Sequence, residues 1–383
     1  MLKKFTLKNY RNFKDEISID FQDIAGYQFS TDCIEDGVIR KMLIYGRNAT
    51  GKTNLAEAFM DIYFILFGRP KNMDMGVFLN ADSAEETAEF SYVFQFDNKE
   101  MMYHYARFSN YDLQSEELGI DGITVFSCNF SSNEYHFENL CYIDAETANT
   151  ERYLQSLEAG GETEETMEPK LPFLRWLMSN MALKSGSVLM QLESYVNRMM
   201  VVTAENGIRI RPRAANYSFY KMLEEGKLQD LECFLNVMGV ECRLALKKLP
   251  DGQYELYFIH ERLVPFYENA SSGTLALVHL YRRMFSKAWD PSLVYLDEFD
   301  AFYHYEMAEN IVKFFKKRYP KCQMIMTTHN TNLMTNRLMR PDCVFILSGA
   351  GTLTALCNAT LRELREGHNL EKMYISGEFE KYE

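Results

Sequence analysis

The chain has 383 residues, of which 47% are hydrophobic, and its formal net charge is −13. This length allows one large domain or two, with enough apolar side chains for a sizeable core. The acidic balance argues against strong nonspecific DNA binding, because proteins that bind duplex DNA usually carry a basic surface. The sequence contains no run of about 18 apolar residues, so no transmembrane helix is predicted. The eight cysteines are scattered without a C-x-x-C pair, which indicates reduced thiols in a cytoplasmic protein.

The first part of the chain reads as strands around one helix. Alternating apolar and polar residues predict strands over 1–22, and a short apolar run predicts a buried strand over 41–45. A helix is expected over 54–67. The stretch 87–127 is rich in aromatic and β-branched residues and contains turn signals, so we expect an antiparallel sheet there.

The middle of the chain is predicted to be helical, and strands and helices are predicted to alternate in its last part. Residues 158–168 contain Gly-Gly and many glutamates and read as an exposed loop. Helices are expected over 171–200 and 217–238, followed by a hairpin over 242–260. Strands and helices then alternate over 290–350, which implies a parallel sheet with crossover helices.

The clearest motif is a phosphate-binding loop between the strand 41–45 and the helix 54–67. It matches the pattern G-x-x-x-x-G-K-[ST] at Gly46, Arg47, Asn48, Ala49, Thr50, Gly51, Lys52 and Thr53. The glycines let backbone N–H groups close around phosphate oxygens, and the helix start adds positive potential. Lys52 would reach the β- and γ-phosphates, and the Thr53 hydroxyl would hold Mg²⁺.

Two further predicted strands end in residues suited to nucleotide chemistry. The strand over 292–296 leads into Asp297, which would hold Mg²⁺ through water, and Glu298, which would orient or deprotonate the attacking water. The strand over 323–327 brings His329 to the same edge of the sheet, where it would sense the γ-phosphate. A single histidine is more often structural, so its role depends on the other motifs.

A turn of small residues precedes the acidic strand by about one helix. It consists of Ser271, Ser272, Gly273 and Thr274. Such a turn at a helix start can bind phosphate through backbone N–H groups. An ordinary helix cap is the alternative, and by itself the turn favours that reading.

Together these four elements resemble, in the same order, the ATP-binding-cassette ATPases of the SMC, Rad50 and RecF branch. The resemblance implies an α/β P-loop head with a mixed central sheet, an antiparallel β lobe and a helical insertion in place of a coiled-coil arm. Residues 1–139 would hold the phosphate loop and the β lobe. Residues 140–240 would be the helical insertion, and residues 241–383 would hold the signature loop, the acidic strand and the histidine.

The resemblance also assigns roles to single residues. Ser271, Ser272 and Gly273 would stand in for the signature loop, although they depart from L-S-G-G-Q, and would act on ATP held by a second subunit. Residues 9–13 are similar to the branch's N-F-R-x-F. The residues expected to contact ATP are then Arg11, Gly46, Asn48, Ala49, Thr50, Gly51, Lys52, Thr53 and Asn54. Thr53 and Asp297 would bind the metal, and Lys52, Glu298 and His329 would act in catalysis.

A narrower similarity, carried by residues 296–300, 327–333 and 369–377, is to the RloC and AbiL-type bacterial ATPases, also called AAA15 proteins. Members of that family are associated with abortive infection and anti-phage defence, often beside a Toprim-type or other nuclease. The similarity is poor over 140–240. RloC has a zinc hook and a long coiled coil, and this sequence has neither a C-x-x-C pair nor long heptads. An RloC-like cleavage of tRNA is therefore not expected.

Three functions follow. The first is a cytoplasmic ATP-hydrolysing switch that works as an ATP-sandwiched homodimer or higher even oligomer and controls an effector such as a nuclease, with a phage component as trigger. The second is a DNA-maintenance ATPase of the RecF or Rad50 type, which would bind nucleic acid. The third is a toxin with its effector in residues 140–240. No base-reading residue is identifiable, so ATP rather than GTP rests on the resemblance, and Gln95 is the candidate for the glutamine that follows the first sheet in these cassettes.

Overall fold

The computed structural model describes residues 1–68, 77–109, 112–159, 170–203, 207–210, 219–250, 252–284 and 290–383. The predicted acidic loop therefore lies almost entirely outside the described residues. Within them, no helix is both long and apolar enough to cross a membrane.

The central sheet is mixed, as predicted, and in the described part of the chain its order is β12-β11-β16-β17-β5-β18-β19. Its strands are β5 (Lys41–Tyr45), β11 (Met199–Thr203), β12 (Gly207–Ile210), β16 (Leu293–Asp297), β17 (Gln323–Thr328), β18 (Val344–Leu347) and β19 (Leu353–Ala355). The inner strands pair in parallel and the two edge strands pair antiparallel. Strands β5, β16 and β17 are buried along their whole length, as is usual for parallel strands covered on both faces.

Strand β11 corrects the helix expected over 171–200. The helices α4 (Phe173–Asn180) and α5 (Val188–Asn197) are separate, and the chain then enters the central sheet beside β16. The run Met-Met-Val-Val-Thr of β11 is apolar and partly β-branched, so pairing within the sheet outweighs the helical pattern. The segment 140–240 thus supplies strands to the central sheet, and its standing as a separate insertion stays a prediction.

The antiparallel lobe confirms the sheet predicted over 87–127. Its order is β10-β9-β8-β7-β6-β1-β2. The strands are β1 (Leu2–Lys8), β2 (Ile17–Asp20), β6 (Ala88–Phe96), β7 (Lys99–Arg107), β8 (Leu113–Ile120), β9 (Ile123–Asn129) and β10 (Glu134–His136). Residues of β6 alternate between buried and half-buried, as expected for a sheet with one face on the core.

Helix α1 (Lys52–Phe59) lies between the two large sheets. The Phe59 ring stacks on Phe5 of β1 at 4.2 Å between centroids and lies 6.0 Å from the Tyr295 ring of β16. Helix α2 (Asp61–Phe67) follows after a break at Met60, where one helix was expected. The helix that begins at the phosphate loop therefore joins both sheets into one core.

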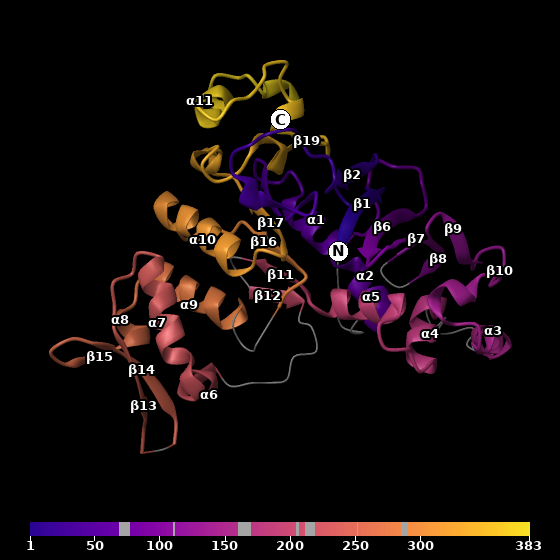
Figure 1. Cartoon of the computed structure of the whole chain (residues 1–383), viewed down its shortest axis with the longest axis horizontal. Coiled ribbons are helices and arrows are strands. Elements are labelled where there is room, and N and C mark those ends of the chain that lie inside the picture. Colours follow the sequence, from indigo (N-terminus) through magenta and orange to yellow (C-terminus); the bar gives the residue numbers. More distant parts are fainter. Residues whose placement is uncertain are drawn as a thin grey trace.

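A smaller sheet forms the hairpin predicted over 242–260. It consists of β13 (Leu244–Lys248), β14 (Tyr254–Ile259) and β15 (Leu263–Pro265), all antiparallel. In Figure 1 this sheet, with α6 (Phe219–Met222), α7 (Leu228–Val237) and α8 (Phe266–Asn269), lies on the opposite side of the central sheet from α4 and β8–β10.

The other elements are short or cover the central sheet. They are β3 (Ile34–Glu35), β4 (Val38–Ile39), α3 (Thr150–Ala159), the π-helical turn Leu223–Lys227, α9 (Ser272–Met284), α10 (Tyr305–Arg318) and α11 (Leu370–Ile375). Short 3₁₀ turns lie at Thr31–Cys33, Leu140–Ile143, Thr331–Leu333, Pro341–Cys343, Leu356–Asn358 and Glu380–Tyr382. The helix expected over 217–238 is thus confirmed from residue 219, with a π-helical turn within it.

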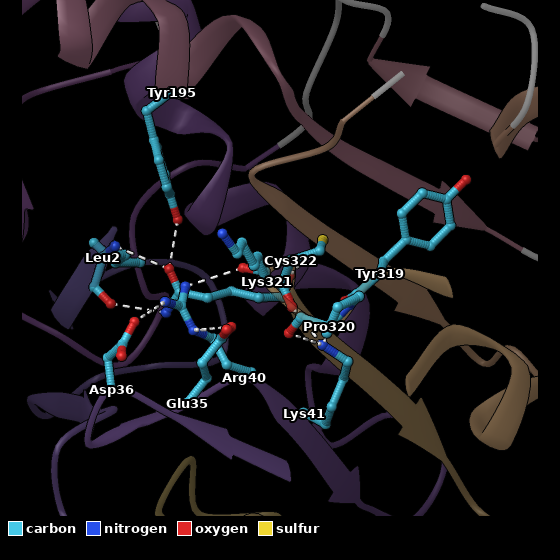
Figure 2. A network of polar contacts seen from close by, with 11 residues as sticks. Leu2, Glu35, Asp36, Arg40, Lys41, Tyr195, Tyr319, Pro320, Lys321 and Cys322 are labelled. Atoms are coloured by element: carbon cyan, nitrogen blue, oxygen red, sulfur yellow. Dashed lines mark hydrogen bonds and ion pairs between the residues drawn. The ribbon is translucent and has the colours of Figure 1, made fainter. Parts of the chain in front are cut away.

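One glutamine, Gln323, joins the two large sheets at the amino ends of β1 and β17, and Figure 2 labels two residues that it contacts, Leu2 and Tyr195. The Leu2 N–H donates to Gln323 Oε1 at 2.9 Å, and Gln323 Nε2 donates back to the Leu2 carbonyl at 2.8 Å. The Tyr195 hydroxyl of α5 donates to the same Oε1 at 2.7 Å. Gln323 is fully buried, so its amide takes the place of a neighbouring strand for the start of β1.

A buried lysine binds three backbone carbonyls at the same edge of the central sheet. Lys41 Nζ donates to the carbonyls of Tyr319, Pro320 and Cys322 at 2.9, 3.1 and 2.7 Å. These carbonyls follow the end of α10, where a positive charge complements the helix dipole. Burial nevertheless lowers the pKa of Lys41 to about 8. Gln323 and Lys41 therefore occupy the edge of the sheet where the parallel strands begin. A ligand can bind at the opposite edge, where these strands end.

Candidate nucleotide site

The phosphate loop connects β5 to α1 in the predicted way. Ala49 and Gly51 have φ of 64° and 100°, and α1 begins at Lys52 directly after Gly51. A Cβ on Gly46 would lie 2.6 Å from Thr50 Oγ1 and 3.2 Å from the Leu347 carbonyl. The loop therefore needs glycine at its first position for packing and at Gly51 for backbone conformation.

Lys52 lies folded over its own loop. Its Nζ donates to the carbonyls of Gly46 and Arg47, both at 2.9 Å, and lies 3.4 Å from Glu298 Oε1. The side chain is only 3% exposed. The Tyr295 hydroxyl of β16 donates to the Lys52 carbonyl at 2.8 Å, which fixes the first turn of α1 to the sheet. The ammonium group is thus held at the mouth of the loop by contacts that an incoming phosphate can replace.

The two predicted metal ligands lie in contact. Thr53 Oγ1 donates to Asp297 Oδ2 at 2.6 Å, and Thr327 Oγ1 donates to Asp297 Oδ1 at 2.9 Å. Burial raises the pKa of Asp297, and the two hydroxyl donors oppose that shift. A hydroxyl and a carboxylate are the oxygen ligands that Mg²⁺ prefers, so these residues fit a magnesium ion that also binds phosphate.

Glu298 has an unusual backbone conformation for its type. Its φ is 45°, and its N–H donates to Thr327 Oγ1 at 2.8 Å. The side chain is 39% exposed and lines a cavity of about 250 Å³ together with Asn12, Ala49, Gly51, Lys52, Thr53 and Asn54. A left-handed non-glycine residue costs free energy and is common at functional sites. The role of Thr327, which links Asp297 to Glu298, was not predicted from the sequence. The feature that could have indicated it is the pair of threonines at the end of the buried strand β17.

The turn at residues 9–13 packs against the phosphate loop. Arg11 Nη1 donates to Asn54 Oδ1 at 2.8 Å and lies 2.6 Å from Glu57 Oε2, both on α1. A Cβ on Gly51 would lie 3.1 Å from the Cβ of Asn12. Asn12, which also receives a hydrogen bond from Asn54, was missed by the sequence reasoning. Arg11 thus lies beside the start of α1, and its contact with a nucleotide stays a prediction.

His329 follows β17 and is exposed at the carboxyl edge of the sheet. The Gly46 N–H donates to the carbonyl of the preceding Thr328 at 3.2 Å, which places His329 next to the start of the phosphate loop. In the described part of the chain His329 makes no hydrogen bond or ion pair with Lys52 or Glu298. Its role as a γ-phosphate sensor therefore stays a prediction.

The small-residue turn caps α9. Ser271 Oγ accepts a hydrogen bond from the Thr274 N–H at 3.1 Å, as in an ordinary helix cap. A Cβ on Gly273 would lie 3.2 Å from the Phe302 carbonyl, so this position packs against the loop after β16. Among the described residues Ser271, Ser272 and Gly273 make no hydrogen bond with the phosphate loop of their own chain. Their action on a second subunit's ATP stays a prediction.

Comparison with known proteins gives one family match and several similar structures. Residues 205–335 match a family described as "AAA domain, putative AbiEii toxin, Type IV TA system". This segment contains the small-residue turn, the acidic strand and His329, and it excludes the phosphate loop. None of the curated proteins compared by sequence matches the chain.

The similar structures include the SMC head domain from Thermotoga maritima, with 14% identity, 92% of this chain and 98% of that chain covered, and a TM-score of 0.46. Another is the Pyrococcus furiosus Smc head domain with an extended coiled coil bound to the C-terminal domain of ScpA (12% identity, 93% and 96% covered, TM-score 0.46). An SmcHead bound to the C-winged helix domain of ScpA has 14% identity, 93% and 97% coverage and a TM-score of 0.47.

The fold is that of a P-loop ATPase head of the ABC type. Strand β17 lies between β5, which precedes the phosphate loop, and the acidic strand β16, and all three are parallel. The antiparallel lobe packs on α1. The predicted fold class is therefore confirmed.

Gln95 lies away from this site. Strands β1 and β6 pair so that Lys8, next to the 9–13 turn, faces Glu89, whereas Leu2 faces Phe94 at the other end. The Gln95 carbonyl accepts a hydrogen bond from the Met1 amino group at that remote end. Gln95 is thus the wrong candidate for a glutamine at the nucleotide.

Proposed function

We propose that the chain is an ATP-hydrolysing switch subunit of a bacterial anti-phage defence system, which works as an ATP-sandwiched homodimer in the cytoplasm and controls an effector. One observation carries the ATPase part of the proposal. Lys52, Thr53 and Glu298 line one cavity at the start of α1 and the end of β16, and the Thr53 hydroxyl lies 2.6 Å from Asp297. This is the set of groups that phosphoryl transfer to water requires.

The residues would act as follows. Backbone N–H groups of the loop and Lys52 bind the phosphates, and Thr53 and Asp297 hold Mg²⁺, which neutralises charge on the phosphate oxygens. When Lys52 turns to the phosphates it leaves Glu298, whose carboxylate is then free to accept a proton from water. His329 reads the γ-phosphate, and Ser271, Ser272 and Gly273 complete the site of the other subunit.

Two observations support the defence role. The description of the family that matches residues 205–335 names a toxin–antitoxin system, which favours defence over DNA maintenance. The net charge of −13 points the same way. A nuclease-type effector and a phage component as trigger belong to the proposal. So does the division into residues 1–139, 140–240 and 241–383.

The test is ATP turnover by the purified chain and two variants. Lys52→Ala should abolish ATP binding, and Glu298→Gln should bind ATP but turn it over about 100-fold more slowly, the usual effect of losing a general base. Lys313→Ala and Glu306→Gln, both on exposed positions of α10, are the matched controls. Unchanged turnover in both site variants would refute the ATPase assignment.

The dimer is tested separately. Glu298→Gln with ATP should have twice the native mass of the same variant with ADP, because uncleaved ATP keeps the two heads together. A monomer in both states would rule out the ATP-sandwiched dimer. Co-expression with neighbouring genes and mass analysis of the complex would then identify an effector.

A further inference from the structure

A second cavity lies beside the phosphate loop. It has a volume of about 250 Å³ and is lined by residues 46–50, the end of β18, Tyr45, Tyr374 and Glu383. Ala49 lines this cavity and also the one that contains Glu298, so the two adjoin. Strand β18 flanks β5 on the side opposite β17 and β16. The second cavity therefore extends from the phosphate loop in the direction away from the catalytic carboxylates.

A buried tyrosine hydroxyl lies in this cavity. Tyr374 of α11 is 8% exposed, and its hydroxyl interacts with the side chains of Tyr45, Arg47 and Glu383, although none of these contacts within the described residues has the geometry of a regular hydrogen bond. Its ring meets the Tyr45 ring edge-on, with centroids 4.7 Å apart. Burial raises the pKa of Tyr374, so the hydroxyl stays protonated and can donate. A ligand atom that accepts a well-aligned hydrogen bond from this hydroxyl would therefore stabilise it more than these poorly aligned contacts do.

An acceptor lies in the same cavity. The Glu383 side chain is 11% exposed and forms an ion pair with Arg47, the second residue of the phosphate loop. The cavity thus combines a donor from α11, a carboxylate from the end of the chain's last 3₁₀ turn, and apolar contacts from Ile346 and Leu347. Figure 1 shows α11 and the C-terminus at the same end of the molecule as β19. The segment 369–377, which the phosphate chemistry does not use, supplies one of the two polar groups.

We propose that this cavity binds the base of the nucleotide whose phosphates occupy the loop, and that Tyr374 and Glu383 select adenine. This inference rests on the proposed ATPase function and adds the base recognition that the sequence motifs lack. Adenine offers an exocyclic amine beside an acceptor ring nitrogen. The amine donates to the Glu383 carboxylate, and the ring nitrogen accepts from the Tyr374 hydroxyl. Guanine presents a carbonyl in place of that amine, which faces the carboxylate unfavourably.

The experiment compares binding of ATP, GTP and inorganic tripolyphosphate, each with Mg²⁺, to the full chain. Tripolyphosphate probes the phosphate loop without a base. Tyr374→Phe should weaken ATP binding about tenfold, the effect of one hydrogen bond, and leave tripolyphosphate binding unchanged. Glu383→Gln should reduce the preference for ATP over GTP, because an amide can donate to the guanine carbonyl as well as accept. Tyr382→Phe and Glu380→Gln, outside the cavity lining, are the matched controls.

Three outcomes decide the matter. If both variants bind ATP and GTP as the wild type does, while ATP binding still needs Lys52, the base site is refuted and the ATPase function stands. If either variant binds ATP more tightly, the segment 369–383 obstructs the loop instead of recognising a base. If the wild-type chain binds neither ATP nor tripolyphosphate, both proposals fall. Unchanged tripolyphosphate affinity shows that each variant is folded.

Discussion

Thr327 offers the sharpest test of how the site is held together. Its hydroxyl donates to Asp297 Oδ1 at 2.9 Å and accepts from the Glu298 N–H at 2.8 Å. Both bonds are buried or partly buried, and the second holds a residue whose φ is 45°. Thr327→Val keeps the shape of the side chain and removes both bonds. The carboxylate then loses one donor, and the strained Glu298 backbone loses its anchor.

The size of the effect follows from these contacts. A hydrogen bond to a charged group contributes about 1.5–3 kcal/mol, and one to a neutral group about 1 kcal/mol. If about 2 kcal/mol of this total serves to position Glu298 and Asp297 in the transition state, kcat falls about 30-fold. ATP affinity should change little, because the loop and Lys52 are untouched. The assay is steady-state ATP turnover at saturating Mg²⁺ and ATP, together with direct measurement of ATP binding.

Two variants control this experiment. Thr327→Ser keeps the hydroxyl and should retain most of the turnover. Thr335→Val makes the same change at a hydroxyl that has no hydrogen-bond partner in the described part of the chain, so it should be nearly neutral. If Thr327→Val is folded and its kcat lies within threefold of the wild type, the positioning role of Thr327 is wrong.

Three stability predictions follow from buried polar groups elsewhere. Gln323→Leu should lower the free energy of unfolding by about 3 kcal/mol in urea titrations, because the backbone of β1 and the Tyr195 hydroxyl lose their partner. Burial raises the pKa of Glu116 to about 7, so its contribution to stability is present below pH 4.5 and is lost as the pH rises through 7. The free energy of unfolding should therefore fall by about 3 kcal/mol across this pH range. Glu116→Gln should abolish this dependence on pH. Asp61→Ala should cost about 3–5 kcal/mol, because Arg107, 2.6 Å from Asp61, loses its carboxylate in a buried site.

Each of these has a matched comparison. Gln95→Leu removes an amide that donates to the exposed carbonyl of Asp97, so it should cost far less than Gln323→Leu. Glu117→Gln, the half-buried neighbour of Glu116, should keep the wild-type pH slope. Adding Arg107→Met to Asp61→Ala should recover part of the loss. Equal costs at Gln95 and Gln323, a pH slope that survives Glu116→Gln, or no recovery would contradict the respective argument.

The sequence predicts the parts of this molecule whose signal is continuous along the chain. The phosphate loop is readable because eight neighbouring residues perform its function, and the strand ending in Asp297 and Glu298 is readable because apolar and acidic residues follow one another. Thr327 escapes prediction because its function arises only when β17 pairs with β16. Strand β11 escapes because a five-residue apolar run is equally compatible with the end of a helix.

The position of Tyr374 beside the phosphate loop could not be predicted from the sequence either. The segment around it was recognisable as a similarity, yet nothing local indicated that its hydroxyl would lie beside the phosphate loop. The contact depends on β18 and α11 folding back onto the end of β5.

The strand order of the central sheet also sets when the protein can assemble during its synthesis. The strand before the phosphate loop is made long before its partners, because Lys41 pairs with Met324 and Leu43 with Val344. A growing chain therefore exposes both edges of β5 until residues 323–347 have been made, and contacts between such distant segments form slowly. The antiparallel lobe pairs mainly with near neighbours and can fold first. A nascent chain would thus acquire its nucleotide site after the antiparallel lobe, and a product that ends before residue 297 would hold the loop without Asp297 and Glu298.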